Sequence, residues 1–433
     1  MLMQSTLILV IAFIVFLFCG VPISIGIGMS SILTALVSVP WDVLSYTAAQ
    51  RCFSGIDSFA LLAIPFFMLA GNIMNKGGIA ARLVGLAKLI GGRLPGALAH
   101  ANVIANMFFG SISGSSIAAT AAIGGIMAPL EEQEGYDPAY SAAVNISSAP
   151  TGILIPPSGP LILYSLVSGG TSIAALFMGG YLPGLLMGLS VMVVAGYYAK
   201  KNGYRIEKQS TGAEAWKIVV DAIPSLSMAV VVMGGILLGV FTPTEAAAIA
   251  VVYSLILAFA YKQIKWRELP GIFADTMLSA ATILFLIAAS GIMSWIMAYT
   301  GIPQAISEMI MGISDNKIVI LLIMNIVLLF VGTFMDLTPA VLIFTPIFLP
   351  IATSLGIDPV HFGIIMIFNL GIGNVTPPVG SCLFVGCGVG KVTIEQVTKY
   401  ILPFFLALIA ALMLVTYIPQ ITLFLPRLTG AMV

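Results

Sequence analysis

The sequence predicts an all-α protein that crosses a membrane many times. Of its 433 residues 60% are hydrophobic and only 8% are charged, and the mean hydropathy is +1.11. Soluble domains carry about 25% charged residues, so a sizeable soluble domain is excluded. The apolar stretches are also far longer than the roughly ten alternating residues of a transmembrane strand, which excludes a β-barrel. Nucleic acid is excluded as a partner, because the 17 basic and 17 acidic residues cancel and form no basic run.

The helices are predicted from apolar stretches that lie between glycine, proline and charged residues. A spanning helix needs about 20 residues. The first stretch lacks the basic start and the cleavage site of a signal peptide, so we expect a retained first helix. The predicted helices cover residues 4–19, 22–39, 53–75, 138–168, 172–199, 218–240, 243–261, 270–300, 358–388 and 398–425. Two shorter amphipathic segments, 79–92 and 302–313, are predicted to lie along the membrane surface.

Structure-breaking residues recur at an offset of 221 residues, which predicts an internal repeat. The matching pairs include Pro22 and Pro243, Pro129 and Pro350, Asp137 and Asp358, Pro157 and Pro378, and Gly159 and Gly380. Glycine and proline determine where helices break, so both halves should break at corresponding places. We therefore divide the chain into a first repeat (1–199), a cytoplasmic connector (200–217) and a second repeat (218–433).

The second repeat is predicted to be inverted relative to the first. Five unambiguous spans precede the connector, and an odd number of spans reverses the direction in which the next repeat begins. The basic residues of 76–93, of the connector and of 262–267 can all be cytoplasmic in one topology, with both termini outside. Inverted repeats with interrupted helices are typical of secondary transporters, whose site lies at the repeat interface near the membrane midplane.

Residues 95–134 and 316–355 are each predicted to form a re-entrant hairpin. Each segment has two apolar limbs that are joined by a polar turn, SISGSS in the first and TFMDLTPA in the second. A limb of about fifteen residues reaches roughly 22 Å, which is less than the ~30 Å hydrocarbon core. Two full spans with a turn at the surface are the alternative that length alone leaves open.

Each hairpin precedes a helix that a proline pair interrupts, within 138–168 and 358–388. Proline removes amide donors, so the carbonyls upstream lose their helical partners. With Ser, Thr and Asn oxygens nearby and no thiolate or imidazole, such carbonyls suit Na⁺ rather than zinc or copper. Helix N-termini at the same breaks favour a carboxylate. The alternative is that the small residues only let the helices pack closely.

The sequence also predicts the roles of a few individual residues. Asp336 lies in the second hairpin turn and is expected to be functional, although a helix cap is the competing role. Glu245 is expected only to stabilise the start of a helix. His100 and His361 have no partner set in the sequence, so we assign neither to a proton relay. The four cysteines lack the spacing of a metal or redox site and are predicted to be buried as small apolar side chains.

Four segments resemble the large membrane subunit of TRAP (tripartite ATP-independent periplasmic) transporters. They are GIDSFALLAIPFFMLAGNIMNKGGI, FFGSISGSSIAATAAIG, SSAPTGILIPPSGPLILY and GIGNVTPPVGSCLFVG. The resemblance implies a sodium-driven importer in the bacterial inner membrane, which moves organic acids such as sialic acid or a C4-dicarboxylate by an elevator movement. It also implies two partners. One is a small four-helix membrane subunit, expected as a separate chain because this sequence starts at its first helix, and the other is a periplasmic binding protein that delivers the substrate.

The resemblance further implies two sodium sites and one substrate site. The first sodium site would comprise Gly110, Ser111, Ser115, Asn145, Thr151, Gly152, Pro157 and Ser158. The second would comprise Gly332, Thr333, Asp336, Gly371, Gly373, Asn374 and Thr376. The substrate anion would lie between the hairpin turns, near Ser113, Gly114, Ser116, Thr338 and Pro378. These motifs contain no Arg or Lys, so a carboxylate would depend on amides, hydroxyls and the sodium ions.

Two other functions stay open on the sequence. A stand-alone divalent-anion/sodium symporter would need no binding protein, and uptake by this chain alone would identify it. An intramembrane enzyme is the second alternative, and the lack of a His/Asp/Glu or Ser/Lys set at membrane depth argues against it.

Overall fold

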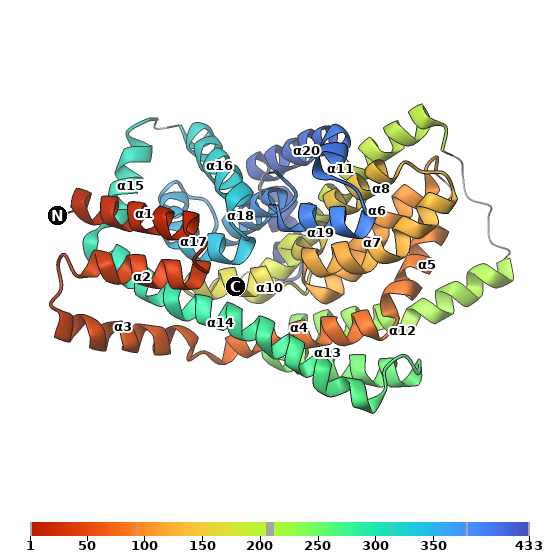
Figure 1. Cartoon of the computed structure of the whole chain (residues 1–433), viewed down its shortest axis with the longest axis horizontal. Coiled ribbons are helices and arrows are strands. Elements are labelled where there is room, and N and C mark those ends of the chain that lie inside the picture. The colour runs from red at the N-terminus through yellow and green to blue at the C-terminus, as the bar shows by residue number, and fades with distance from the viewer. Residues whose placement is uncertain (1, 93, 205–211, 315, 378–379, 432–433) are drawn as a thin grey trace.

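A computed structural model describes residues 2–92, 94–204, 212–314, 316–377 and 380–431. Within these ranges all regular secondary structure is helical, which confirms the predicted all-α class (Figure 1). Eight of the described helices are long and apolar enough to span a membrane, or nine if the bent pair Pro138–Leu154 and Gly159–Val167 counts as one span.

The first half begins with helices that do not belong to the hairpin. These are α1 (Leu2–Phe18), α2 (Ile23–Ala35), α3 (Trp41–Ile56), the 3₁₀ turn η1 (Phe59–Leu62), α4 (Ala63–Lys76) and α5 (Ile79–Gly91). The prediction of one helix over 53–75 was wrong, because the chain breaks at Asp57 and Ser58 and a separate helix α3 precedes the break. Helix α3 mixes Asp42, Gln50 and Arg51 with its apolar residues, so it does not form an apolar stretch.

The hairpin and the broken helix of the first half follow in order. They are α6 (Ala97–Ser113), α7 (Ser116–Gln133), α8 (Pro138–Ser148), α9 (Thr151–Leu154), α10 (Gly159–Val167) and the long helix α11 (Ile173–Asn202). The break between α9 and α10 is the predicted one, and the axis bends there by 48°.

The second half repeats this order. It comprises α12 (Gly212–Leu237), α13 (Pro243–Ala260), η2 (Trp266–Glu268), α14 (Leu269–Thr300), α15 (Ile302–Met311), α16 (Lys317–Phe334), α17 (Leu337–Ser354), α18 (Pro359–Gly373), α19 (Ser381–Gly390), α20 (Ile394–Tyr417) and α21 (Gln420–Leu428). The helix predicted over 398–425 is in fact two helices, because the helical hydrogen bonding of α20 ends at Ile418 and α21 begins after Pro419.

The helix bounds recur with the offset that the sequence predicts. Adding 221 to the bounds of α7, 116 and 133, gives 337 and 354, which are the bounds of α17. Adding 221 to the first residues of α8 and α11, 138 and 173, gives 359 and 394, the first residues of α18 and α20. The halves differ where α3, η1 and α4 correspond to the single helix α14, where α8 and α9 correspond to the single helix α18, and where the single helix α11 corresponds to α20 and α21. The inversion of the second half stays a prediction.

The hairpin limbs are longer than the sequence suggested. Helices α6 and α7 have 17 and 18 residues, and α16 and α17 have 18 each. At 1.5 Å per residue these limbs reach about 27 Å, so their length does not separate a re-entrant hairpin from two spans. The position of the first turn favours the re-entrant hairpin. Its residues Ser113 and Ser116 are buried inside the protein, whereas a turn between two full spans would lie at the surface.

Two of the smaller predictions have clear outcomes. Glu245 does stabilise a helix start, because its Oε2 accepts hydrogen bonds from the amide and the hydroxyl of Thr242, both at 2.8 Å, at the beginning of α13. The cysteine prediction was wrong for Cys19, which is exposed, and for Cys52, which is only partly buried. An apolar stretch in a membrane protein can face lipid as well as the core, so hydropathy alone does not indicate burial.

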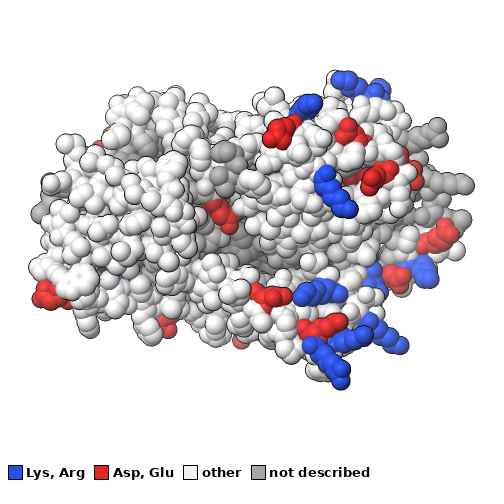
Figure 2. Space-filling model, viewed as in Figure 1, with Lys and Arg blue, Asp and Glu red and all other residues white. Residues whose placement is uncertain are grey.

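Charges and amphipathic helices give the molecule two different ends. Figure 2 shows the Lys and Arg side chains of the visible face gathered toward one end, the right-hand end in this view. The amphipathic helices α5 and α15 lie at opposite ends of the molecule, at the right and the left of Figure 1. Basic residues favour the cytoplasmic side, so the end with α5 should be cytoplasmic and the end with α15 periplasmic.

This orientation can be tested with single cysteines in a variant that lacks the four native ones. Lys265, in the exposed connection after α13, and Met309, which is 70% exposed on α15, are suitable positions. We expect a membrane-impermeant maleimide to label Lys265→Cys only in inverted vesicles and Met309→Cys only in intact spheroplasts. Labelling of both from the same side would contradict the proposed topology.

Candidate functional site

The two hairpin turns and both helix breaks meet at one cavity with a volume of about 450 Å³. The first turn contributes residues 113–116 and the second contributes residues 336–338. Ile153 and Gly159 line the cavity from either side of the first break, and Asn374 lines it from the second. Helices α4 and α14 form the opposite wall. The fold therefore brings together segments that lie more than 200 residues apart in the sequence.

The first hairpin touches the first broken helix backbone to backbone. Gly110 of α6 lies against Gly152 of α9, and a Cβ on either residue would overlap the Cα of the other. Gly114, at the tip of the turn, has a left-handed backbone conformation with φ +62°. A Cβ on Gly114 would lie 3.4 Å from the carbonyl oxygen of Pro157. The turn and the break are thus held together by contacts that only glycine permits.

The second hairpin touches its broken helix in the same way. Gly332 of α16 lies against Gly373 of α18, where a Cβ on Gly373 would lie 2.6 Å from the Cα of Gly332. The offset of 221 residues relates Gly152 to Gly373, and it relates Gly110 to Gly332 within one residue. The two predicted cation sites are therefore built on equivalent contacts.

The hydroxyl groups of the first predicted sodium site mostly bond the nearby backbone. Ser111 Oγ donates to the carbonyl of Phe108 (2.8 Å) and Thr151 Oγ1 donates to that of Ser148 (2.7 Å). Ser115 Oγ accepts from the amide of Ala118 (3.2 Å) and caps α7. Ser158 caps α10 and is fully buried. These bonds fix the positions of the oxygens and leave lone pairs on each of them.

The second predicted site combines a hydroxyl, a carboxylate and backbone groups. Thr376 Oγ1 donates to the carbonyl of Ile372 (2.7 Å), and Asp336 Oδ1 accepts from Ser381 Oγ (3.3 Å). Asp336 directly precedes α17, but its side chain forms no capping hydrogen bond. The third residue of that helix is Pro339, which has no amide hydrogen to donate. The structure therefore does not support a helix cap as the role of Asp336.

Buried asparagines connect each hairpin to its broken helix. Asn106 Nδ2 donates to Asn145 Oδ1 (3.0 Å), which ties α6 to α8, and Asn145 itself donates to the carbonyl of Thr120 (2.9 Å). In the second half Asn369 Nδ2 donates to Asn325 Oδ1 (2.8 Å), which ties α18 to α16. The Oδ1 atoms of Asn106 and Asn369 are buried and have no hydrogen-bond partner among the described residues.

Sequence reasoning missed Asn106, Asn325 and Asn369. The sequence does contain an indication of their importance. Each asparagine interrupts a long apolar helix, and a polar amide at membrane depth needs a hydrogen-bond partner. Asn106 precedes Gly110 by four residues, and Asn369 precedes Gly373 by four. Each unpartnered oxygen thus comes from the helical turn that leads to a glycine contact.

Of the fifteen residues predicted for the two sodium sites, only Ser115, Asp336 and Asn374 line the cavity itself. Gly371 packs on the other side of α18, where a Cβ would lie 2.8 Å from Ile153 Cδ1 of the first half. Thr333 Oγ1 donates to the carbonyl of Phe330 (2.7 Å), and Thr333 does not line the cavity. Pro378 lies outside the described residues. The remaining predicted substrate residues, Ser113, Gly114, Ser116 and Thr338, all line the cavity.

The wall of the cavity formed by α4 and α14 was not predicted to be polar. Asn72 and Asn75 of α4 and Ser279 of α14 all line it. Asn72 Nδ2 donates to Thr276 Oγ1 (2.8 Å) and so joins the two wall helices. The signal that could have found them is the three-residue spacing of the two asparagines, which places both on one helix face.

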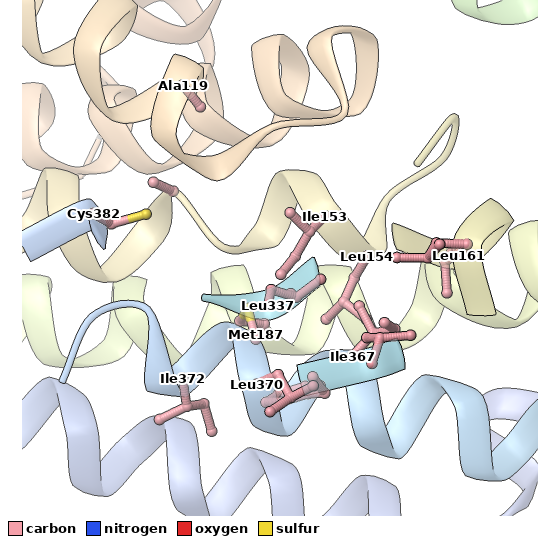
Figure 3. Close-up of a cluster of buried hydrophobic side chains, with 14 of the residues drawn as sticks. Ala119, Ile153, Leu154, Leu161, Met187, Leu337, Ile367, Leu370, Ile372 and Cys382 are labelled. Atoms are coloured by element: carbon pink, nitrogen blue, oxygen red, sulfur yellow. The ribbon is translucent and has the colours of Figure 1, made fainter. Parts of the chain in front are cut away.

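Apolar side chains from both halves pack behind the site. Figure 3 shows Leu337, which follows Asp336, close to Ile153 of the first broken helix and to Leu370 of the second. Ile153, Leu337 and Leu370 are each at most 4% exposed. The two turns and the two breaks therefore share one core, and a shift of one of them would disturb the others.

The glycine contacts predict that alanine substitutions at the contact positions lower stability more than an alanine substitution elsewhere. Gly152→Ala and Gly373→Ala should each lower stability by about 1–3 kcal/mol, because the added Cβ overlaps a backbone that cannot move aside. Gly125→Ala in α7 is the matched control, since nothing lies within 4 Å of a Cβ at that position. The measurement is the unfolding temperature of each purified variant in detergent. Equal stability of all three variants would show that the backbones are not in tight contact.

The comparisons with known proteins agree on one family. The family model described as "Tripartite ATP-independent periplasmic transporter, DctM component" matches residues 10–421. The chain is 55% identical to the uncharacterised protein YgiK of Salmonella typhimurium, with 96% of each chain covered. It is 38% identical to the C4-dicarboxylate TRAP transporter large permease protein DctM of Rhodobacter capsulatus, over 99% of this chain and 100% of that protein. It is 42% identical to the isethionate permease DctMQ of Oleidesulfovibrio alaskensis, covering 95% of this chain and 65% of that longer protein.

Among solved structures, the YdaH transporter of Alcanivorax borkumensis has a similar fold. The TM-score is 0.64 at 16% sequence identity, and the match covers 87% of this chain and 89% of YdaH. At this identity the likeness shows the fold alone. Family membership rests on the sequence matches, which span nearly the whole chain. The chain belongs to the DctM family and is the large, multi-pass inner-membrane subunit of a TRAP transporter, a transport protein and not an enzyme.

Proposed function

We propose that the chain is a sodium-coupled importer that carries an organic acid, received from a periplasmic binding protein, by an elevator movement. The observation that supports this most directly is the single cavity at which both hairpin turns and both helix breaks meet. Secondary transporters with interrupted helices bind substrate and coupling ions at such a junction.

Sodium as the co-transported ion fits the oxygens at the two junctions. The residues are neutral hydroxyls, amides and backbone groups with one carboxylate, Asp336. The described residues contain no group of three or more His, Cys, Asp or Glu side chains that could hold a metal ion. The Oδ1 atoms of Asn106 and Asn369 have no partner among the described residues, and a buried amide oxygen without a partner is unfavourable. A hard cation is a partner that such oxygen ligands suit.

An elevator movement is supported by how the helices group. The hairpins and broken helices of the two halves contact one another, since α10 packs on α17 and α18, and α11 lies between α6 and α18. Tyr164 in α10 donates a hydrogen bond to the carbonyl of Pro359 in α18 (2.7 Å). Helices α2, α3 and α4 pack on α14, and α13 packs on α4, in a second group. The cavity lies at the boundary of the two groups, where sliding would move a bound substrate.

The proposed partners follow from the family. Members work with a small membrane subunit and a periplasmic binding protein. We propose that the binding protein docks at the end of the molecule that carries α15. Large apolar side chains such as Trp41, Tyr46 and Phe53 are exposed on α3 and would face lipid or the small subunit.

Sodium binding can be tested without a known substrate. In Ser115→Ala and Thr376→Ala one hydroxyl oxygen is lost, and the sodium concentration for half-maximal thermal stabilisation should rise about five- to thirty-fold. Ser172 caps α11 at the same 3.2 Å as Ser115 caps α7, so Ser172→Ala controls for the lost cap. Thr353 donates to a carbonyl four residues earlier, as Thr376 does, so Thr353→Ala is the second control.

The measurement is the unfolding temperature of the purified protein at increasing NaCl concentrations, with choline chloride added to keep the ionic strength constant. Normal sodium dependence of the two site variants, or an equal change in the controls, would mean that the polar turns only help the helices to pack.

Transport itself predicts a dependence on both sodium and the partners. Proteoliposomes that contain this chain and the small subunit should take up substrate only with an inward sodium gradient and the loaded binding protein. With two or more sodium ions per monoanion, a potential of −100 mV should accelerate uptake, since each net charge gains about 2.3 kcal/mol. Uptake driven equally by a proton gradient would contradict sodium coupling. Uptake by this chain alone would instead indicate a stand-alone symporter.

A further inference from the structure

We propose that the cavity prefers a monoanionic carboxylate with several hydroxyl groups to a compact dicarboxylate, and that Asn72 on α4 sets this preference. The inference rests on the proposed transport function. It concerns the chemistry of the substrate, which the comparisons do not decide. The relatives are named for isethionate, a monoanion, and for C4-dicarboxylates, which are dianions.

The charges around the cavity favour a single negative charge on the substrate. Among the described residues that line it, Asp336 is the only ionisable one. The basic residue that follows Asn75 on α4, Lys76, pairs with Asp275 of α14 at 3.4 Å. Two bound sodium ions and Asp336 sum to one positive charge, which one carboxylate neutralises. A dianion would leave a net negative charge, with or without the sodium ions, and this is costly where water is scarce.

The hydrogen bond between Asn72 and Thr276 fixes which end of the amide is free. Thr276 Oγ1 donates its single hydrogen to the carbonyl of Ile272 (2.8 Å), so toward Asn72 it can only accept. The NH₂ group of Asn72 must therefore face Thr276, at 2.8 Å. The end that remains for a ligand is Oδ1, which is an acceptor. An acceptor binds hydroxyl or N–H groups and repels a second carboxylate.

The rest of this wall offers further uncharged groups to a substrate. Asn75 lies three residues from Asn72 and also lines the cavity, as does Ser279 of the facing helix α14. Across the cavity stand Ser113 and Ser116 of the first hairpin turn. A ligand whose carboxylate lies near the hairpin turns can therefore place hydroxyl groups against α4. The volume of about 450 Å³ lies within the range of sites for ligands well above four carbons in size.

The test compares gluconate, a hydroxylated monocarboxylate, with succinate, using the full-length protein purified in detergent with NaCl. Affinity is measured from thermal stabilisation as a function of ligand concentration. We expect gluconate to bind about tenfold more tightly than succinate. The informative variant is Thr276→Val, which keeps the shape of the side chain but frees the amide of Asn72 to rotate and donate to a carboxylate. It should reduce the preference for gluconate about three- to tenfold.

Thr282→Val is the matched control. Thr282 lies on the same helix, donates to a carbonyl four residues earlier (3.0 Å), and does not line the cavity. It should leave the preference unchanged. Succinate binding as tightly as gluconate, or equal behaviour of the two variants, would overturn the inference while the transport function stands. If neither these two acids nor isethionate nor N-acetylneuraminate stabilises the protein in NaCl, the proposed function is itself overturned.

Discussion

The structure depends on two places where a hairpin backbone lies directly on the backbone of an interrupted helix. At Gly110 and Gly152, and again at Gly332 and Gly373, there is no room for a Cβ. An interrupted helix exposes polar groups of the main chain, and inside a membrane these groups need partners that water cannot supply. The close contact brings serine and threonine hydroxyls to the break and excludes lipid from it. Each hairpin turn is therefore held at its break by packing, and the two turns are held opposite each other.

The polar groups at this junction are almost all neutral, and this has a physical reason. A charge at membrane depth requires a partner, whereas a hydroxyl can bond a backbone carbonyl one turn away and still offer a lone pair. Ser111, Thr151 and Thr376 all do so. Asp336 is the exception, since it is partly accessible from the cavity and accepts from Ser381. Such a junction is satisfied by its own hydrogen bonds and still presents free lone pairs on its hydroxyl oxygens.

Local features made much of the fold predictable. The turns at residues 113–116 and 336–338, and the breaks near Pro157 and Asn374, follow from Gly, Pro and Ser, whose effects act within a few residues. Helix α3 was missed because its polar residues hide it from a search for apolar stretches. Asn72 was missed for another reason, because only the packing of α4 against the first turn shows which helix forms the wall. The contact of Gly371 with Ile153 of the first half was not predicted, since sequence spacing does not reveal what packs against each side of α18.

One of the differences between the halves lies in that wall. Helix α14 is a continuous rod of 32 residues, whereas the corresponding part of the first half is jointed at Asp57 and Ser58 before α4 begins. The junctions around the glycines are common to both halves, but Asn72 and Asn75 occur on the jointed side. Substitutions on α4 can therefore alter the contacts to cargo without touching the glycine junctions. The architecture thus separates the packing that holds the two turns at their breaks from a wall whose polar side chains can change without disturbing that packing.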